Sequence, residues 1–206
     1  MKKEFVLDQS VCDFSRGIDI AQTILIYLVA LFVPTFLGMI LNQVFGVSNV
    51  VAMNSQLIIG SIVNTALFVT ALNLKGTVKI LGIVTMPSVS TILSGAVFHS
   101  ASVYMFYMIP AIWLGNFSLI YFFKKMFVVN KKNYLFAGIV SILIKVFVIF
   151  GIFQVLRMVS IFPDALVSTL QTSMGMTQLI TAFIGFVLSF AIYKLQGFVK
   201  KKLMIF

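Results

Sequence analysis

Long apolar segments, separated by short polar connections, restrict the fold of this chain more than any other feature. The mean hydropathy is +1.12 and only 10% of the residues are charged, whereas a soluble domain contains about 25%. A helix of ~20 apolar residues crosses ~30 Å of hydrocarbon and satisfies its own backbone hydrogen bonds there. We therefore predict an all-α integral membrane protein, a single domain over residues 1–206 with six transmembrane helices. The predicted spans cover residues 18–46, 51–73, 79–98, 101–123, 134–157 and 174–196.

The basic residues predict the topology. If six spans alternate, nearly all of the 15 basic residues fall on one side of the membrane, and only Arg157 falls on the other, with Lys145 inside a span. Lysine and arginine are enriched in cytoplasmic connections. We therefore expect a multi-pass protein of the cell membrane with both termini in the cytoplasm, including an N-terminal segment 1–17 and a basic tail 197–206. The same distribution accounts for the net charge of +10, so no nucleic-acid partner is expected.

Two segments suggest departures from straight spans. The first span is long and contains Pro34, which predicts a tilt, a kink or an extension beyond the bilayer. The connection 158–173 is the longest on the outer side. It is predicted either as a short amphipathic helix across the outer mouth or as an ordinary interfacial loop.

Lys145 lies in the middle of the span 134–157, in the stretch "SILIKVFVIF". At ~1.5 Å per residue it is about 16–18 Å from either end, too far for its side chain to reach the interface. A lysine at this depth costs ~3 kcal/mol unless it faces protein or water. All five acidic residues fall at or beyond span ends. The amine of Lys145 is therefore deprotonated, or it is charged and either solvated by water and neutral dipoles or paired with an anion from elsewhere. Its role is either structural or ligand-binding.

Other spans place polar side chains at a similar depth. The candidates for a binding site around Lys145 are Asn64, Asn116, Trp113, Ser90 and Thr91. The two asparagines would supply hydrogen bonds, and the indole would stack on a flat ligand; packing against a neighbouring helix is the alternative for Trp113. The site contains no carboxylate, so we expect a small polar or anionic ligand rather than a cation.

A stripe of small residues follows one face of the last span, at Thr177, Thr181, Gly185 and Ser189. Such stripes let another helix approach closely, and the partner helix is predicted either in this chain or in another subunit.

Several chemistries are not indicated. The single cysteine, Cys12, excludes an intrachain disulfide, and with the single histidine, His99, it makes no Cys/His metal cluster. There is no phosphate-binding loop, no acidic proton relay across the core and no catalytic set within the membrane. We therefore predict no enzymatic activity and no cofactor, and any use of ATP belongs to a partner.

The span layout, both ends inside and a polar inner zone without energy-using motifs, resembles the S components of energy-coupling factor (ECF) transporters. The runs "PSVSTILSGAVF" and "IPAIWLGNFSLIYFFKK" are also similar to small membrane proteins grouped near that family. The resemblance implies a six-helix subunit that captures a micronutrient, often a vitamin, from outside. It also implies two kinds of partner, a transmembrane T component and cytoplasmic ATPases. Many family members carry an Ala-x-x-x-Ala pair on the first helix; here Ala21 and Ala30 do not have that spacing.

Two rival functions remain. The chain is alternatively a non-catalytic membrane scaffold or a subunit of a larger complex without a small ligand, in which the polar residues only satisfy one another. A self-sufficient permease would need a second gate or an oligomer.

Overall fold

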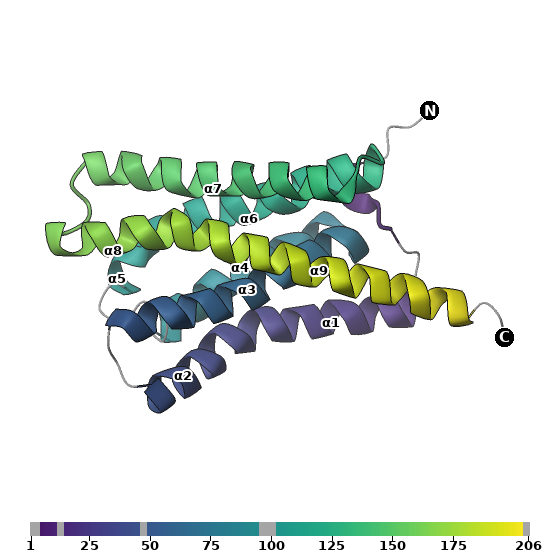
Figure 1. Ribbon diagram of the computed structural model, residues 1–206, viewed down its shortest axis with the longest axis horizontal. Coiled ribbons are helices and arrows are strands. Elements are labelled where there is room, and N and C mark those ends of the chain that lie inside the picture. Colours follow the sequence, from purple (N-terminus) through teal and green to yellow (C-terminus); the bar gives the residue numbers. More distant parts are fainter. Residues whose placement is uncertain (1–4, 12–14, 46–48, 95–101, 204–206) are drawn as a thin grey trace.

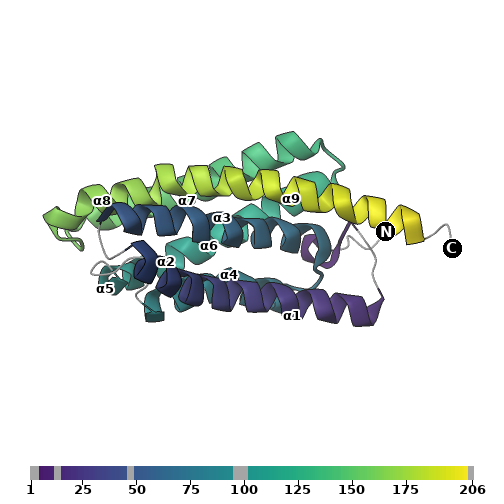
Figure 2. The ribbon, with the colours of Figure 1, turned by 60° about the horizontal axis from the view of Figure 1, so that its bottom comes forward.

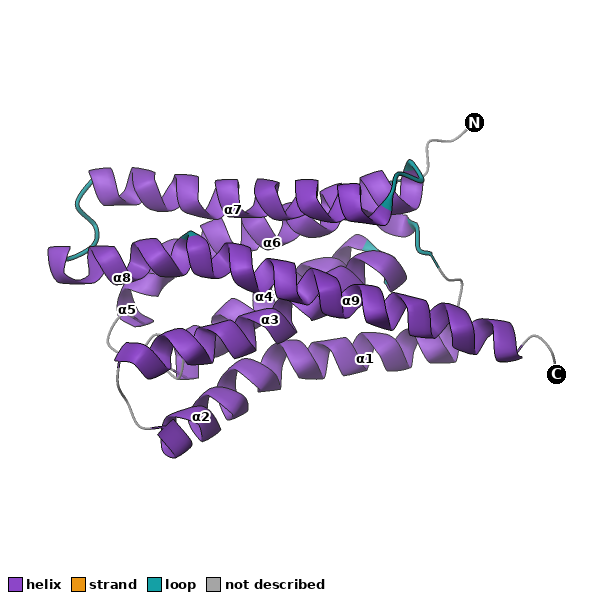
Figure 3. Cartoon of the chain, viewed as in Figure 1, coloured by secondary structure: helices purple, strands orange, loops and turns teal. Residues whose placement is uncertain are grey.

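All regular structure in the described part of the chain is helical (Figure 3). The computed structural model describes residues 5–11, 15–45, 49–94 and 102–203. The longer helices are α1 (Arg16–Phe32), α2 (Gly38–Phe45), α3 (Asn49–Asn73), α4 (Thr77–Ser94), α6 (Ile109–Phe123), α7 (Tyr134–Met158), α8 (Asp164–Met174) and α9 (Met176–Leu203). The shorter elements are η1 (Val6–Asp8), η2 (Val33–Leu37), α5 (Ser102–Met105), η4 (Phe106–Met108) and η5 (Lys124–Val129).

The long helices run along the long axis of an elongated bundle (Figures 1 and 2). The start of α1 and the end of α9 lie at one end, here called the terminal end, whereas α5 and α8 lie at the other, the α8 end (Figure 1). Among the described residues, five helical segments are long and apolar enough to cross a membrane. A multi-pass membrane protein follows from these segments. The predicted third span corresponds to α4, which is not one of the five, so six crossings and the orientation of the termini stay predictions.

The first predicted span is one helical path with a change of register at Pro34. The π-helical segment η2 interrupts it between α1 and α2, and the path bends there (Figure 1). Proline lacks a backbone N–H and its ring excludes the carbonyl one turn earlier. Ser90 of α4 faces this break, donating its Oγ–H to the Leu31 carbonyl at 2.5 Å and hydrogen bonding to Thr35 Oγ1 at 2.5 Å.

The predicted outer connection 158–173 contains helix α8, which begins at Asp164. The helical alternative is therefore correct, but its predicted course across the mouth is wrong, because α8 continues in line with α9 (Figures 1 and 2). Gly175 separates the two helices. The predicted tail 197–206 is also helical as far as Leu203. Cys12 and His99 lie outside the described residues.

Two apolar clusters hold the bundle together, one toward each end. An aromatic cluster near the terminal end includes Phe68, Phe123 and Tyr134, with Phe68 and Phe123 in edge-to-face contact at 5.0 Å between ring centroids. At the α8 end, Met105, Met108 and Phe153 belong to the second cluster. The middle of the bundle, between these clusters, carries the polar side chains described below.

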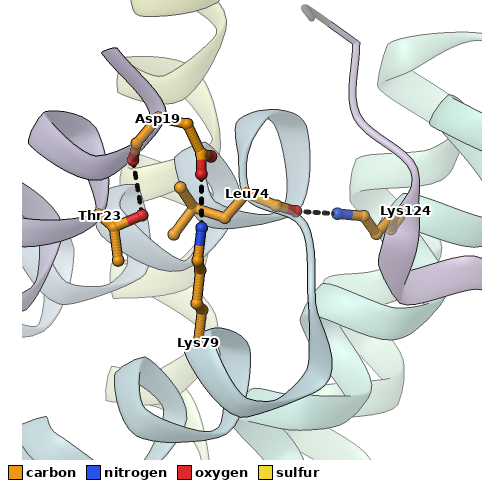
Figure 4. A network of polar contacts seen from close by, with 5 residues as sticks. All are labelled: Asp19, Thr23, Leu74, Lys79 and Lys124. Carbon is orange, nitrogen blue, oxygen red and sulfur yellow. Dashed lines mark hydrogen bonds and ion pairs between the residues drawn. The ribbon is translucent and has the colours of Figure 1, made fainter. Parts of the chain in front are cut away.

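The N-terminal segment packs against the terminal end of the bundle. Leu7 of η1 is buried, its carbonyl accepts from Gly76 N at 3.1 Å, and Val11 N donates to the Leu72 carbonyl at 2.8 Å. Gly76 forms the turn between α3 and α4 with a φ of +96°, a conformation that favours glycine. Lys124, predicted to lie in a polar connection, is instead fully buried in η5 and donates to the Leu74 carbonyl at 2.5 Å (Figure 4).

An ion pair joins α1 to α4 at the same end: Lys79 Nζ lies 2.5 Å from Asp19 Oδ2 (Figure 4). The two side chains are 37% and 28% exposed, and exposed pairs contribute only ~0–1 kcal/mol. We expect Asp19→Asn to lower the free energy of unfolding by less than ~1 kcal/mol, with a smaller loss at high salt because salt screens the pair. Thermal unfolding in detergent at two salt concentrations measures this, and the swap Asp19→Lys with Lys79→Asp should restore stability. A loss that salt does not change would contradict this assignment.

Candidate polar site

The site is organised around the ammonium of Lys145, which points into the bundle. Its side chain is 2% exposed, and Nζ donates to Asn64 Oδ1 of α3 at 2.5 Å. The direct partner of Nζ is therefore a neutral dipole, which can accept from a neutral amine or from an ammonium. An ammonium carries three N–H donors, and the other two have no partner among the described residues.

Asn64 is oriented by helices α3 and α9. Its Nδ2 donates to the Gly60 carbonyl at 2.8 Å and to Thr181 Oγ1 at 3.2 Å. Thr181 in turn donates to the Thr177 carbonyl at 2.8 Å. Because the amide nitrogen is occupied on the α9 side, Oδ1 is left facing the ammonium, where an acceptor is needed.

The small-residue stripe of α9 faces α3 of the same chain. A Cβ added at Gly185 would lie 2.6 Å from Asn64 Cβ and 2.7 Å from Thr65 N, and one added at Gly60 would lie 2.9 Å from Thr181 Cγ2. These distances are below van der Waals contact, so glycine is required for the observed approach of the two helices. Ser189, at the end of the stripe, hydrogen bonds to Tyr134 Oη of α7 at 2.8 Å. The intrachain partner is therefore the correct alternative for this stripe.

A cavity of about 80 Å³ lies beside Lys145. Its polar lining comes from Asn64 and Gln56 of α3, Ser88 and Thr91 of α4, Asn116 of α6 and Gln178 of α9, with apolar lining from Ile59, Val63, Pro87, Met105 and Ile112. An apolar cavity of ~150 Å³ holds benzene, and ~15 Å³ holds one water. The cavity thus has room for several waters or for a group of a few non-hydrogen atoms.

The lining brings together four of the six predicted site residues. Lys145, Asn64, Asn116 and Thr91 line the cavity. Asn116 is fixed by a long contact from its Nδ2 to the Val84 carbonyl, 3.4 Å.

The adjacent Gly115 lets α7 approach closely, because a Cβ there would lie 2.5 Å from Ile149 Cγ1.

The other two predicted site residues do not line the cavity. Trp113 donates its indole N–H to Ser88 Oγ at 2.7 Å, and its ring packs against the aromatic cluster. It therefore positions Ser88, which does line the cavity, and the predicted stacking on a ligand has no support from this geometry. Ser90 points to the opposite side of α4, toward the break at Pro34.

Gln178 belongs to the lining but was not among the predicted residues. Its side-chain amide has no hydrogen-bond partner in the described part of the chain, so both its donor and its acceptor are available. A glutamine inside an apolar span is a signal for such a residue, but Gln178 directly follows Thr177 of the small-residue stripe, and the sequence alone does not place it on the cavity side of the helix.

The electrostatics of the site are one-sided. Of the acidic residues that the structure describes, none lines the cavity, and no cluster of His, Cys, Asp or Glu there could hold a metal. In its protonated form Lys145 faces amides and hydroxyls without a carboxylate to neutralise it. Such a site favours a negatively charged group because Coulomb attraction is stronger at low dielectric.

No protein-family model, curated protein or solved structure matches this chain.

Proposed function

We propose that this chain is the substrate-binding subunit of an uptake transporter of the ECF type, with six membrane crossings. In this proposal the terminal end faces the cytoplasm, because most basic residues gather there, and the ligand enters from the α8 end. A transmembrane T component and cytoplasmic ATPases supply the energy, since the chain has no phosphate-binding loop. The resemblance of the span layout supports these partners.

The observation that carries the proposal is the unneutralised ammonium of Lys145 on the wall of an internal cavity. A buried charge is costly unless hydrogen bonds or a counter-ion compensate it, and here a single amide oxygen does so. Two N–H donors remain for a ligand. The available amide of Gln178 and the apolar side chains opposite complete a site for a small organic anion with an apolar part.

The size of the cavity narrows the ligand class further. About 80 Å³ admits a carboxylate or a similar small anionic group, whereas a large flat vitamin requires the lining helices to move apart. The ligands to test first are therefore small organic acids and inorganic anions.

The test is thermal unfolding of the purified protein in detergent with panels of small organic acids, inorganic anions, neutral amides and amines. A ligand at 100 times its dissociation constant adds ~2.7 kcal/mol to the free energy of unfolding. We expect an anion to raise the unfolding temperature of the wild type, with no response in Lys145→Met. The matched control Lys132→Met removes an exposed lysine at the terminal end and should keep the full response.

One observation favours the scaffold alternative: Lys145, Asn64 and Thr181 already form a connected hydrogen-bond network. A purely structural network predicts that no panel compound changes the unfolding temperature. A response that is equal in the wild type and in Lys145→Met would also contradict the proposal.

A further inference from the structure

A second cavity, of about 380 Å³, lies at the α8 end and carries both signs of charge. Arg157 at the end of α7 and Asp164 at the start of α8 line it, together with Ser160, Ser168 and Gln171. Pockets that hold small molecules measure ~300–1,000 Å³. This cavity shares no lining residue with the one beside Lys145.

The two charges do not neutralise each other. Arg157 Nη1 donates to Gln171 Oε1 at 3.2 Å, and no ion pair within 4.0 Å joins its guanidinium to the Asp164 carboxylate, which has no partner among the described side chains. Both residues are exposed. A guanidinium has five N–H donors, so most of them remain for a ligand, and a carboxylate acceptor lines the same cavity.

A third cavity, of about 470 Å³, continues from the charged one along α7. The two cavities share Ser168 and Gln171, and the apolar lining of the third comes from Val146, Phe150 and Met176. Val146 precedes Arg157 by 11 residues, which is about 16 Å along a helix. That distance is about half of the ~30 Å hydrocarbon core.

We propose that these two adjoining cavities bind one aminophospholipid, with its phosphate at Arg157, its ammonium at Asp164 and an acyl chain along Val146, Phe150 and Met176. Charge at the helix end followed by an apolar groove toward the bilayer centre matches the order of head and tail in a lipid. Guanidinium binds phosphate through paired N–H donors. This site does not depend on the proposed transport function or on which leaflet the α8 end faces.

Asp164 selects among lipid heads. A primary ammonium donates charge-assisted hydrogen bonds to a carboxylate, whereas a trimethylated phosphocholine has no N–H to donate. An anionic phosphatidylglycerol has no cation for Asp164. Phosphatidylethanolamine is therefore the expected ligand among lipids with the same acyl chains.

The experiment is native mass spectrometry of the purified full-length protein, delipidated in detergent and then supplied with phosphatidylethanolamine, phosphatidylglycerol or phosphatidylcholine. We expect one retained phosphatidylethanolamine per chain. Arg157→Gln and Asp164→Asn should each lower its retention about tenfold, because each removes a charge-assisted contact. Arg16→Gln, at an exposed position of the terminal end, is the matched control and should leave retention unchanged.

The groove is tested separately by Met176→Trp, which fills it from a position that is 60% exposed and should lower lipid retention. Unchanged unfolding temperatures establish that the variants fold. Equal or better retention of phosphatidylglycerol, or undiminished retention of phosphatidylethanolamine in Asp164→Asn, would overturn the proposal. Displacement of the lipid by an equal concentration of soluble phosphoethanolamine, with no effect of Met176→Trp, would overturn the lipid assignment.

Discussion

Asn64→Leu is expected to lower the free energy of unfolding by ~3–5 kcal/mol, a large part of the ~5–15 kcal/mol that stabilises a typical protein. Leucine has a similar size to asparagine but no acceptor. The ammonium of Lys145, which is 2% exposed and bonded to Asn64 Oδ1, would then be left buried without its partner. Thermal or denaturant unfolding in detergent, without added ligand, measures the loss.

The double variant Asn64→Leu with Lys145→Met separates charge from packing. Replacing both partners of a buried polar contact by apolar groups of similar shape is nearly neutral. We therefore expect the double variant to recover most of the stability lost in Asn64→Leu. If it is as unstable as Asn64→Leu alone, the loss comes from packing or from the hydrogen bond to Thr181, and Lys145 does not depend on Asn64 as its partner.

Gly185→Ala is expected to destabilise the protein by ~1–3 kcal/mol, the usual cost of overpacking a tight contact. The added Cβ would meet Asn64 Cβ at 2.6 Å, Thr65 N at 2.7 Å and Asn64 C at 2.8 Å. Two of these atoms belong to the α3 backbone, which cannot rotate away, so α3 and α9 must separate. Because Asn64 would move with α3, the response to an anionic ligand should weaken as well.

The matched control is Gly197→Ala in the same helix, where an added Cβ has no heavy atom within 4 Å. Alanine favours a helix over glycine by up to ~1 kcal/mol, so this variant should be as stable as the wild type or slightly more so. Unfolding temperatures of the two variants, measured under the same conditions, test whether the close contact at Gly185 is needed for stability. Equal stability of Gly185→Ala and Gly197→Ala would show that the close approach of α3 and α9 is not needed.

The helical elements could be predicted well because hydropathy acts locally. Residues 51–73 and 134–157 were predicted as spans, and α3 and α7 occupy Asn49–Asn73 and Tyr134–Met158. Boundaries were less accurate where polar and apolar signals conflict. The segment after Met158 was predicted either as a short helix or as a loop, and it contains α8, whose side chains Leu170 and Met174 are buried in one cluster with Ile149 and Phe153 of α7.

The burial of Lys124 could not be predicted from neighbouring residues. In the sequence it adjoins Lys125 and precedes a polar turn, which is typical of an interfacial lysine. It is buried because η5 and the N-terminal segment come together over the Leu74 carbonyl, a contact between residues 50 positions apart.

The sequence by itself determined the membrane class, the helical content and the place of Lys145 in the middle of a long apolar segment, because each depends on the transfer of residues between water and hydrocarbon, one segment at a time. No acidic residue lies near the middle of a predicted span, which likewise made a neutral or external partner necessary if Lys145 is charged. Only the tertiary structure decided which neutral group Lys145 contacts. How the helices rotate and pack also decided that Trp113 hydrogen bonds to Ser88 and that Gln178 lines the cavity. Those rotations follow from contacts such as Gly185 against Asn64 and Gly115 against Ile149, which join residues far apart in the chain. The small-residue stripe that contains Gly185 predicts a close helix contact, but it does not identify the partner helix.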